Sequence, residues 1–234
     1  MAVKAVDIGM SMFYVCSNID SHVETKMTDS LTFYTNPMSR GQIVRWMLAE
    51  VGAPYEQVLL DYGTTMKAPE YLAINPMGKV PAIRHGNRIV TECAAICAYL
   101  AEAFPEAGLA PTAHERADYY RWLFFAAGPV EQAVTNKALG FQVPAEKAMM
   151  AGYGSFDAAI DTLEKAAGAH DYIAGDRFTA ADVYVGAQIL WGLEFGTLPK
   201  RPAFEAYGAR LSQRPAYKRA KEIDGALIAE MQKG

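Results

Sequence analysis

The 234-residue sequence has few cysteines and little net charge, and both narrow the range of functions. Its three cysteines, Cys16, Cys93 and Cys97, are too few and too unevenly spaced for a disulfide framework or a four-ligand zinc site, so no metal is expected. Lysine and arginine are scattered and the formal net charge is -4, unlike the basic surface of a nucleic-acid-binding protein. Apolar runs end before membrane-spanning length. We therefore expect a cytoplasmic protein with no nucleic-acid or membrane partner.

The length suits one or two globular domains, preceded by a segment of different character. Hydrophobic residues make up 51% of the chain and charged residues 21%, an ordinary globular composition. In residues 1–28 a moderately apolar opening contains Lys4 and Asp7, which argues against a signal peptide. We expect residues 1–28 to be a poorly ordered extension. Met27 is an alternative start, which leaves open whether residues 1–26 belong to the natural protein.

From residue 31 the apolar pattern predicts a small α/β domain, which we place at residues 29–105. The expected elements are a strand at 31–34, a helix at 43–51, a strand at 55–60, a short helix at 69–73, a hairpin of strands at 81–84 and 88–90, and a helix ending near 104. The first strand, helix and second strand form a βαβ unit, whose strands are parallel. This order of elements matches a thioredoxin-like fold.

Beyond a linker at 106–111 the pattern predicts helices only, in a second domain at residues 112–234. The first helix begins at the candidate capping box of Thr112 and Glu115, and the second is expected over 144–167. A third helix opens at the Thr-Ala-Ala-Asp segment 179–182. The last begins at Pro215, and its expected apolar face consists of Ala220, Ile223, Leu227, Ile228 and Met231.

Four segments, in their order and spacing, resemble the cytosolic glutathione S-transferase family of the bacterial, beta- or theta-like type. They are Phe-Tyr-Thr-Asn-Pro-Met-Ser-Arg at 33–40, Asn-Pro-Met-Gly-Lys-Val-Pro at 75–81, Thr-Glu-Cys-Ala-Ala-Ile at 91–96 and Phe-Thr-Ala-Ala-Asp at 178–182. The resemblance covers residues 31 to about 220. It implies a thioredoxin-like domain that binds glutathione, an all-helical domain that holds a second substrate, and a homodimer.

The resemblance also assigns a glutathione site, whose residues are Lys79, Val80, Pro81, Glu92, Cys93 and Lys67. A cis-Pro81 turns the backbone of Val80 outward to pair with the cysteinyl part of the tripeptide. The free N–H groups at the start of the helix that follows Glu92 favour the γ-glutamyl carboxylate, and Glu92 itself receives the α-ammonium group. Lys79, with Lys67 as second candidate, is expected to bind the glycine carboxylate.

Cys93 departs from the family pattern, which usually has serine after the acidic residue. A thiol is a weaker hydrogen-bond donor than a hydroxyl, although the backbone N–H is unaffected. A thiol at a helix N-terminus also tends toward a lowered pKa, so a mixed disulfide between Cys93 and glutathione is an alternative to simple occupation of the site.

The residue that activates the thiol lies in the turn after the first strand, where Tyr34, Asn36 and Ser39 are the candidates. A donor near the sulfur stabilises the thiolate that attacks an electrophile. If Pro37 is the first helical residue, Asn36 is the N-cap and its side chain is partly committed to backbone N–H groups. If the helix begins after Ser39, residues 39–42 form a capping box, Ser39 is the committed residue and Asn36 projects from the loop. Spacing favours the second case. Family members with a catalytic serine commonly place it at the position of Asn36. We therefore expect Asn36 to be the principal activator, Ser39 an alternative and Tyr34 a pocket wall.

The second substrate is expected between the domains, beside Trp191, Phe124, Gly128 and Glu131, with a kink at Gly128-Pro129. The implied function is conjugation of glutathione, as cosubstrate, to a small hydrophobic electrophile in detoxification. Alternatives on the same scaffold are a glutathione-dependent reductase, isomerase or dehalogenase, or a glutathione-binding protein without catalysis. The identity of the electrophile and the geometry of the dimer do not follow from the sequence.

Overall fold

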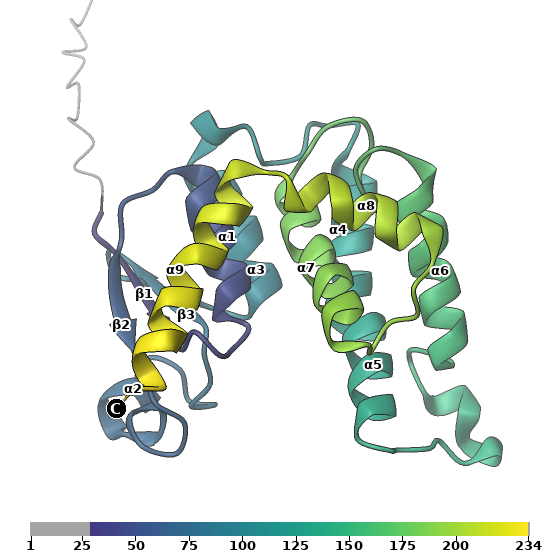
Figure 1. Cartoon of the computed structure of the whole chain (residues 1–234), viewed down its shortest axis with the longest axis horizontal. Helices are drawn as coiled ribbons and strands as arrows, with labels where there is room; N and C mark the ends of the chain where they lie inside the picture. The colour runs from purple at the N-terminus through teal and green to yellow at the C-terminus, as the bar shows by residue number, and fades with distance from the viewer. Residues whose placement is uncertain (1–28, 234) are drawn as a thin grey trace, which may run out of the picture.

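A computed structural model describes residues 29–233, and the expected extension at 1–28 lies outside the described residues. Four strands form one mixed sheet of order β2-β1-β3-β4 (Figure 1). The strands are β1 (Leu31–Thr35), β2 (Glu56–Leu59), β3 (Ala82–His85) and β4 (Arg88–Thr91). β1 runs parallel to β2 and antiparallel to β3, which pairs antiparallel with β4. The predicted βαβ unit and hairpin are therefore confirmed.

A tight turn between β3 and β4 depends on glycine. Gly86 has a φ of 59°, in the left-handed region that favours glycine. A Cβ at this position would also lie 2.8 Å from the carboxylate of Asp29. Gly86 N–H donates to the carbonyl of Ser30, which ties the turn to the start of β1.

Three helices accompany the sheet: α1 (Gly41–Val51), α2 (Pro69–Leu72) and α3 (Cys93–Ala103). A 3-10 turn at Thr65–Lys67 precedes α2. α1 and α3 lie between the sheet and the helical bundle of the second half of the chain (Figure 1). Fully buried side chains of both helices, including Trp46, Met47, Ile96 and Leu100, join one apolar core with Phe33 of β1 and with α7. This core fixes the ends of β1 and β3 relative to the helices.

The second half of the described chain is helical, as predicted. Its elements are 3-10 turns at Pro105–Ala107 and Ala145–Met150, α4 (Arg116–Phe125), a π-helical turn (Ala126–Val130), α5 (Glu131–Ala138), α6 (Phe156–Ala169), α7 (Ala180–Phe195), α8 (Pro202–Ser212) and α9 (Pro215–Met231). The π turn contains Gly128 and Pro129, where a kink was expected. Asp182 caps α7 by accepting from Thr179 N at 2.8 Å and Ile173 N at 2.7 Å.

Two helical predictions were wrong. The segment 144–167 is not one helix, because Gly154 adopts a φ of 70° and Ser155 starts α6 by accepting from Ala158 N at 3.1 Å. In α9, Ile223 and Met231 are 43% and 40% exposed, while Asp224 is buried. The hydrophobic pattern failed there because one buried position of the helix is a carboxylate.

α9 follows the helical bundle in sequence but lies against α1, on the side of the molecule that carries the sheet (Figure 1). Arg214 begins this contact with two hydrogen bonds to Glu50 of 2.6 and 2.7 Å. The ring of Tyr217 then packs edge-on against Trp46, with ring centres 4.9 Å apart. α9 thus reaches the neighbourhood of the turn that follows β1. Within residues 29–233 no helix combines the length and apolar character needed to cross a membrane.

Candidate active site

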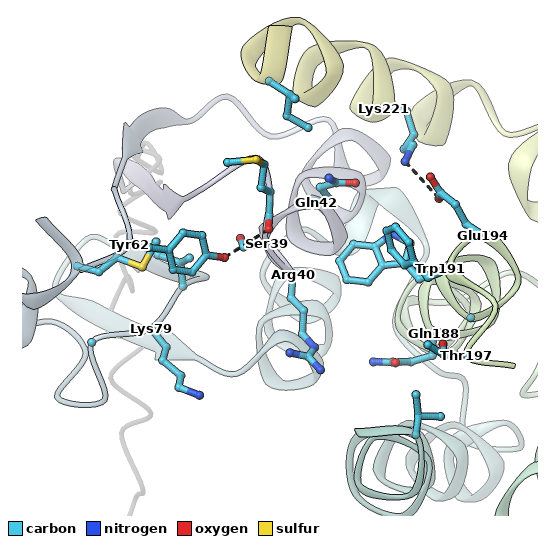
Figure 2. A pocket seen from close by; sticks show the side chains of 18 of the residues that line it. Ser39, Arg40, Gln42, Tyr62, Lys79, Gln188, Trp191, Glu194, Thr197 and Lys221 are labelled. Carbon is cyan, nitrogen blue, oxygen red and sulfur yellow. Dashed lines mark hydrogen bonds and ion pairs between the residues drawn. The ribbon is translucent and has the colours of Figure 1, made fainter. Parts of the chain in front are cut away.

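A cavity of about 740 Å³, here called the cleft, lies between the sheet-bearing part and the helical bundle. Figure 2 shows side chains from the start of α1, from the loops beside the sheet and from α7 and α9 around it. Its defining residues are Ser39, Lys79, Val80, Trp191, Glu194 and Lys221. A large, partly apolar cavity between two structural units is the usual form of a small-molecule site.

A second cavity of about 270 Å³, here called the side pocket, adjoins the cleft. Arg40, Lys79 and Val80 line both cavities, and Glu92 and Cys93 line the side pocket alone. Together the two cavities provide a continuous binding surface from the start of α3 to α9.

The peptide bond between Val80 and Pro81 is cis, as the resemblance implied. The preceding carbonyl of Lys79 accepts hydrogen bonds from Tyr71 Oη at 2.6 Å and Asn75 Nδ2 at 2.7 Å. Burial raises the pKa of Tyr71 to about 12, which keeps its hydroxyl a donor. Among residues 29–233 neither backbone polar group of Val80 has a hydrogen-bond partner. Val80 therefore presents a free donor and acceptor where both cavities meet.

Lys67 and Lys79 have different surroundings. Lys67 Nζ donates to the carbonyls of Gly78 at 2.8 Å and Met77 at 3.3 Å, so it holds the loop before the cis-proline. Gly78 has a φ of 56°, and a Cβ there would lie 2.7 Å from the carbonyl of Met66. Lys79 lines both cavities and has no ion pair within the described part of the chain. Of the two lysines, Lys79 is the more available to a ligand anion.

Glu92 occupies the N-cap of α3 with φ 66° and ψ 121°, and it is the single non-glycine residue of positive φ among residues 29–233. Such a conformation costs on the order of 1 to 3 kcal/mol and is found most often at binding and catalytic sites. It presents the first N–H groups of α3 and the Glu92 carboxylate to the side pocket.

The Cys93 thiol is 8% exposed and donates to the carbonyl of Arg40 at 3.6 Å. Burial raises its pKa to about 12, and the nearby Arg40 guanidinium offsets this only in part. The expected lowering of the pKa by the helix N-terminus is therefore not found, because burial dominates. A thiol that stays protonated at neutral pH is a poor nucleophile and a poor partner for a mixed disulfide.

The turn after β1 places the three candidate activators differently. Asn36 is 1% exposed, and its amide donates to the Leu60 carbonyl at 2.8 Å and accepts from Met38 N at 2.9 Å. The expectation that Asn36 projects from the loop is therefore wrong, because it joins the ends of β1 and β2. Tyr34 is 8% exposed, packs against Tyr71 and lines neither cavity, so it does not form the expected pocket wall.

Ser39 is the candidate that lines the cleft. Its Oγ donates to the Asn36 carbonyl at 2.6 Å and accepts from Gly41 N at 2.9 Å. α1 begins only at Gly41, as one of the two considered alternatives required. Gln42 bonds to the Pro37 carbonyl instead of to Ser39, so the reciprocal capping box is absent at this helix start.

Comparison with known proteins decides the family. Profiles of the N-terminal and C-terminal glutathione S-transferase domains match residues 29–102 and 131–207. Glutathione S-transferase F10 of Arabidopsis thaliana is 30% identical over 65% of this chain and 76% of its own length. Glutathione S-transferase GST-4.5 of Xanthomonas campestris is 29% identical over 83% of this chain and 99% of its own. The chain belongs to the glutathione S-transferase family.

Solved structures of the family support this membership. The theta-class glutathione S-transferase of Xanthomonas axonopodis pv. citri, with glutathione bound, superposes with a TM-score of 0.67 and is 26% identical. The match covers 82% of this chain and 97% of that one. The predicted combination of a thioredoxin-like domain and an all-helical domain is thus confirmed.

Of the four residues expected beside the second substrate, only two line one of the two cavities. Trp191 of α7 lines the cleft, and Glu131 lines the side pocket. Phe124 is 67% exposed and borders neither cavity. Gly128 is an exposed residue of the π turn, where an added Cβ would meet nothing within 4 Å. The helical spacing that grouped these residues does not specify which face of α4 turns toward the cleft.

Two further sets of residues at the site were not identified from the sequence. Arg40 forms an ion pair with Glu131 at 3.0 Å, and Tyr184 Oη donates to the same carboxylate at 3.0 Å. Burial raises the pKa of Tyr184 and so keeps it a donor. Lys221 and Glu194, from α9 and α7, line the cleft. These residues are distant from one another in sequence, so no local pattern groups them at the site. Only Arg40 could have been found locally, because it directly follows Ser39.

Proposed function

We propose that this protein is an active glutathione S-transferase that conjugates the glutathione thiolate to a small hydrophobic electrophile. The observation that carries this proposal is the meeting of three segments at the two cavities: Ser39 in the first turn, Val80 before the cis-proline and Glu92 at the start of α3. Similarity to transferases solved with glutathione bound supports the choice of ligand. Glutathione is the cosubstrate, and no metal takes part in the proposed reaction.

In this proposal the tripeptide extends from the side pocket into the cleft. Its γ-glutamyl carboxylate accepts from the first N–H groups of α3, and its ammonium group binds Glu92. The free N–H and C=O of Val80 pair with the cysteinyl backbone as an added strand would. Lys79 binds the glycine carboxylate, while Lys67 keeps its loop in place. Each charged group of the ligand then meets an opposite charge or a helix terminus.

We assign thiol activation to Ser39 rather than Asn36. The single hydroxyl hydrogen of Ser39 bonds to the Asn36 carbonyl and can rotate toward a thiolate in the cleft. Asn36 is buried, and its amide already bonds to Leu60. A donor to the sulfur lowers the thiol pKa because it stabilises the anion. Arg40, which follows Ser39 and lines both cavities, adds positive charge nearby.

A reductase that uses Cys93 is less well supported, because this thiol is buried and its pKa is raised. The test of the proposed function is conjugation of glutathione to a panel of aromatic halides, epoxides and enones, with products identified by mass spectrometry. Formation of glutathione conjugates above the uncatalysed rate is expected. Retention on immobilised glutathione without any conjugation would instead indicate a binding protein that lacks catalysis.

Three further expectations belong to this proposal. We propose a division into domains at residues 29–105 and 112–234 with a linker at 106–111, a homodimer in solution, and a cytoplasmic location. Light scattering tests the dimer, since a monomer at micromolar concentration would contradict it. Limited proteolysis tests the linker, with first cleavage expected between the two domains. Fluorescence microscopy of the tagged full chain tests the location.

A further inference from the structure

We propose that Lys221 and Glu194 form a charged end of the cleft, here called the Lys–Glu end, which selects electrophiles carrying a carboxylate. The inference rests on the proposed function and specifies its substrate class. It concerns two residues that bind no part of glutathione in the arrangement above. The electrophile would be an aromatic compound that places its ring against Trp191 and its carboxylate against Lys221.

The ion pair at the Lys–Glu end is loose enough to admit a ligand. Lys221 Nζ lies 3.7 Å from Glu194 Oε2, and the two side chains are 39% and 50% exposed (Figure 2). An exposed pair of this kind contributes about 0 to 1 kcal/mol, so it offers little resistance to rearrangement. The ammonium group also has three donor hydrogens, and one carboxylate at 3.7 Å does not occupy them all.

An aromatic wall lies next to this charged end. Trp191 sits one turn before Glu194 on α7 and lines the cleft, with Phe195 packed edge-on at 6.3 Å between ring centres. Trp191 and Lys221 also border one small void between α1, α7 and α9, which shows that they are neighbours. A ring against the indole therefore has the Lys221 ammonium within reach of a substituent.

The charge of the cleft favours an anion over a cation. Its lining within the described chain contains the cations Arg40, Lys67, Lys79 and Lys221 and one acid, Glu194. Arg40 is paired with Glu131, Lys67 bonds to backbone carbonyls, and Lys79 is assigned to glutathione. Lys221 is therefore the cation left for the second substrate.

The two acids that follow Lys221 on α9, Glu222 and Asp224, form no ion pair with it among residues 29–233, and Glu222 is exposed outside the lining of the cleft. Asp224 is turned toward α1, where it pairs with Arg45 at 2.7 Å. Glu194 neutralises Lys221 only in part, because the pair is long and exposed. The lining of the cleft as a whole, with four cations and one acid, therefore keeps a net positive charge that attracts an anionic substituent.

The test compares chloronitrobenzoate, with chlorine ortho to the nitro group, and the corresponding neutral benzamide. In both reactions the glutathione thiolate forms a carbon–sulfur bond at the ring carbon and chloride leaves. Rates are divided by the uncatalysed rate of each compound. Lys221→Met should lower kcat/KM for the benzoate by roughly three- to tenfold, mainly through KM, and leave the benzamide within about twofold.

Glu194→Gln should raise kcat/KM for the benzoate by about twofold to threefold, because it removes the competing acid. Lys218→Met is the matched control, since Lys218 lies on the same helix but bonds to Gln213 outside the cleft. If both compounds are conjugated but Lys221→Met does not change the ratio of their kcat/KM values, this inference is overturned while the proposed function stands. If neither compound nor any electrophile of the panel were conjugated, the proposed function would fail, and the inference with it.

Discussion

Arg45 of α1 and Asp224 of α9 form a buried ion pair of 2.7 Å between residues 179 positions apart in sequence. Their side chains are 1% and 2% exposed, and Tyr55 Oη accepts a further hydrogen bond from Arg45 at 2.8 Å. Arg45 Nη2 and Asp224 Oδ2 have no partner among residues 29–233. The pair therefore holds α9, the helix that carries Lys221, against α1.

Removing one partner of this pair should destabilise the protein strongly. Asp224→Ala leaves a buried guanidinium without a counter-charge, which costs about 3 to 5 kcal/mol of unfolding free energy. Urea denaturation measures this loss. The double variant Arg45→Met with Asp224→Leu should recover most of it, because two apolar side chains need no partner. Glu222→Ala, an exposed position on the same helix, serves as control, and an equal loss there would contradict the role of the pair.

Glu92 is expected to contribute to glutathione affinity rather than to folding. Glu92→Ala should weaken binding by about tenfold to a hundredfold, since a hydrogen bond to a charged group is worth about 1.5 to 3 kcal/mol. Calorimetric titration with glutathione measures the change, and Glu92→Gln, which keeps the shape without the charge, should fall between. Unchanged affinity in Glu92→Ala would mean that the residue only starts α3.

Cys93 should be chemically inert near neutral pH. Because burial raises its pKa to about 12, the thiol remains protonated and should react slowly with iodoacetamide and oxidised glutathione. Intact-mass analysis after incubation of the folded protein should show neither adduct at Cys93, while denaturation in urea should restore its reactivity. A rapid glutathione adduct mapped to this residue would revive the mixed-disulfide alternative.

Glu115 should stabilise the fold in a pH-dependent way. Two hydrogen bonds from Arg177, of 2.6 and 3.1 Å, hold the pKa of Glu115 below its usual value. The ionised carboxylate therefore stabilises the folded state above its unfolded-state pKa, and this contribution is lost as the pH falls through the folded-state pKa.

Glu115→Gln should consequently cost about 1 kcal/mol at neutral pH, a value discounted for the partial exposure of Arg177. Denaturation of both proteins across the acid range measures the dependence. The difference between them should shrink as the pH drops below about 4. A constant difference across that range would show that the carboxylate charge is not what matters.

Local signals in the sequence predicted much of the fold and of the glutathione site. The turn after β1, the segment before cis-Pro81 and the start of α3 each depend on a few adjacent residues, so the resemblance to the family, carried by those residues, indicated their positions in a glutathione site. The orientation of Asn36 was not predicted, because its amide bonds to the carbonyl of Leu60, 24 positions away. The burial of Asp224 and the contribution of Lys221 to the cleft depend on how α9 packs against α1, which no local pattern records.

The ionisation of bound glutathione tests the central claim most directly. Thiolate absorbance of the complex, titrated against pH, should give a thiol pKa well below the value of about 8.5 for a free cysteine thiol. Ser39→Ala should raise this pKa toward the free value, whereas Tyr34→Phe should not change it. Asn36→Ala also removes the hydrogen bond to Leu60, so the pKa of its bound thiol is compared with that of the other variants at equal saturation with glutathione. A bound thiol with the pKa of free glutathione, or a larger rise in Asn36→Ala than in Ser39→Ala, would contradict activation by Ser39.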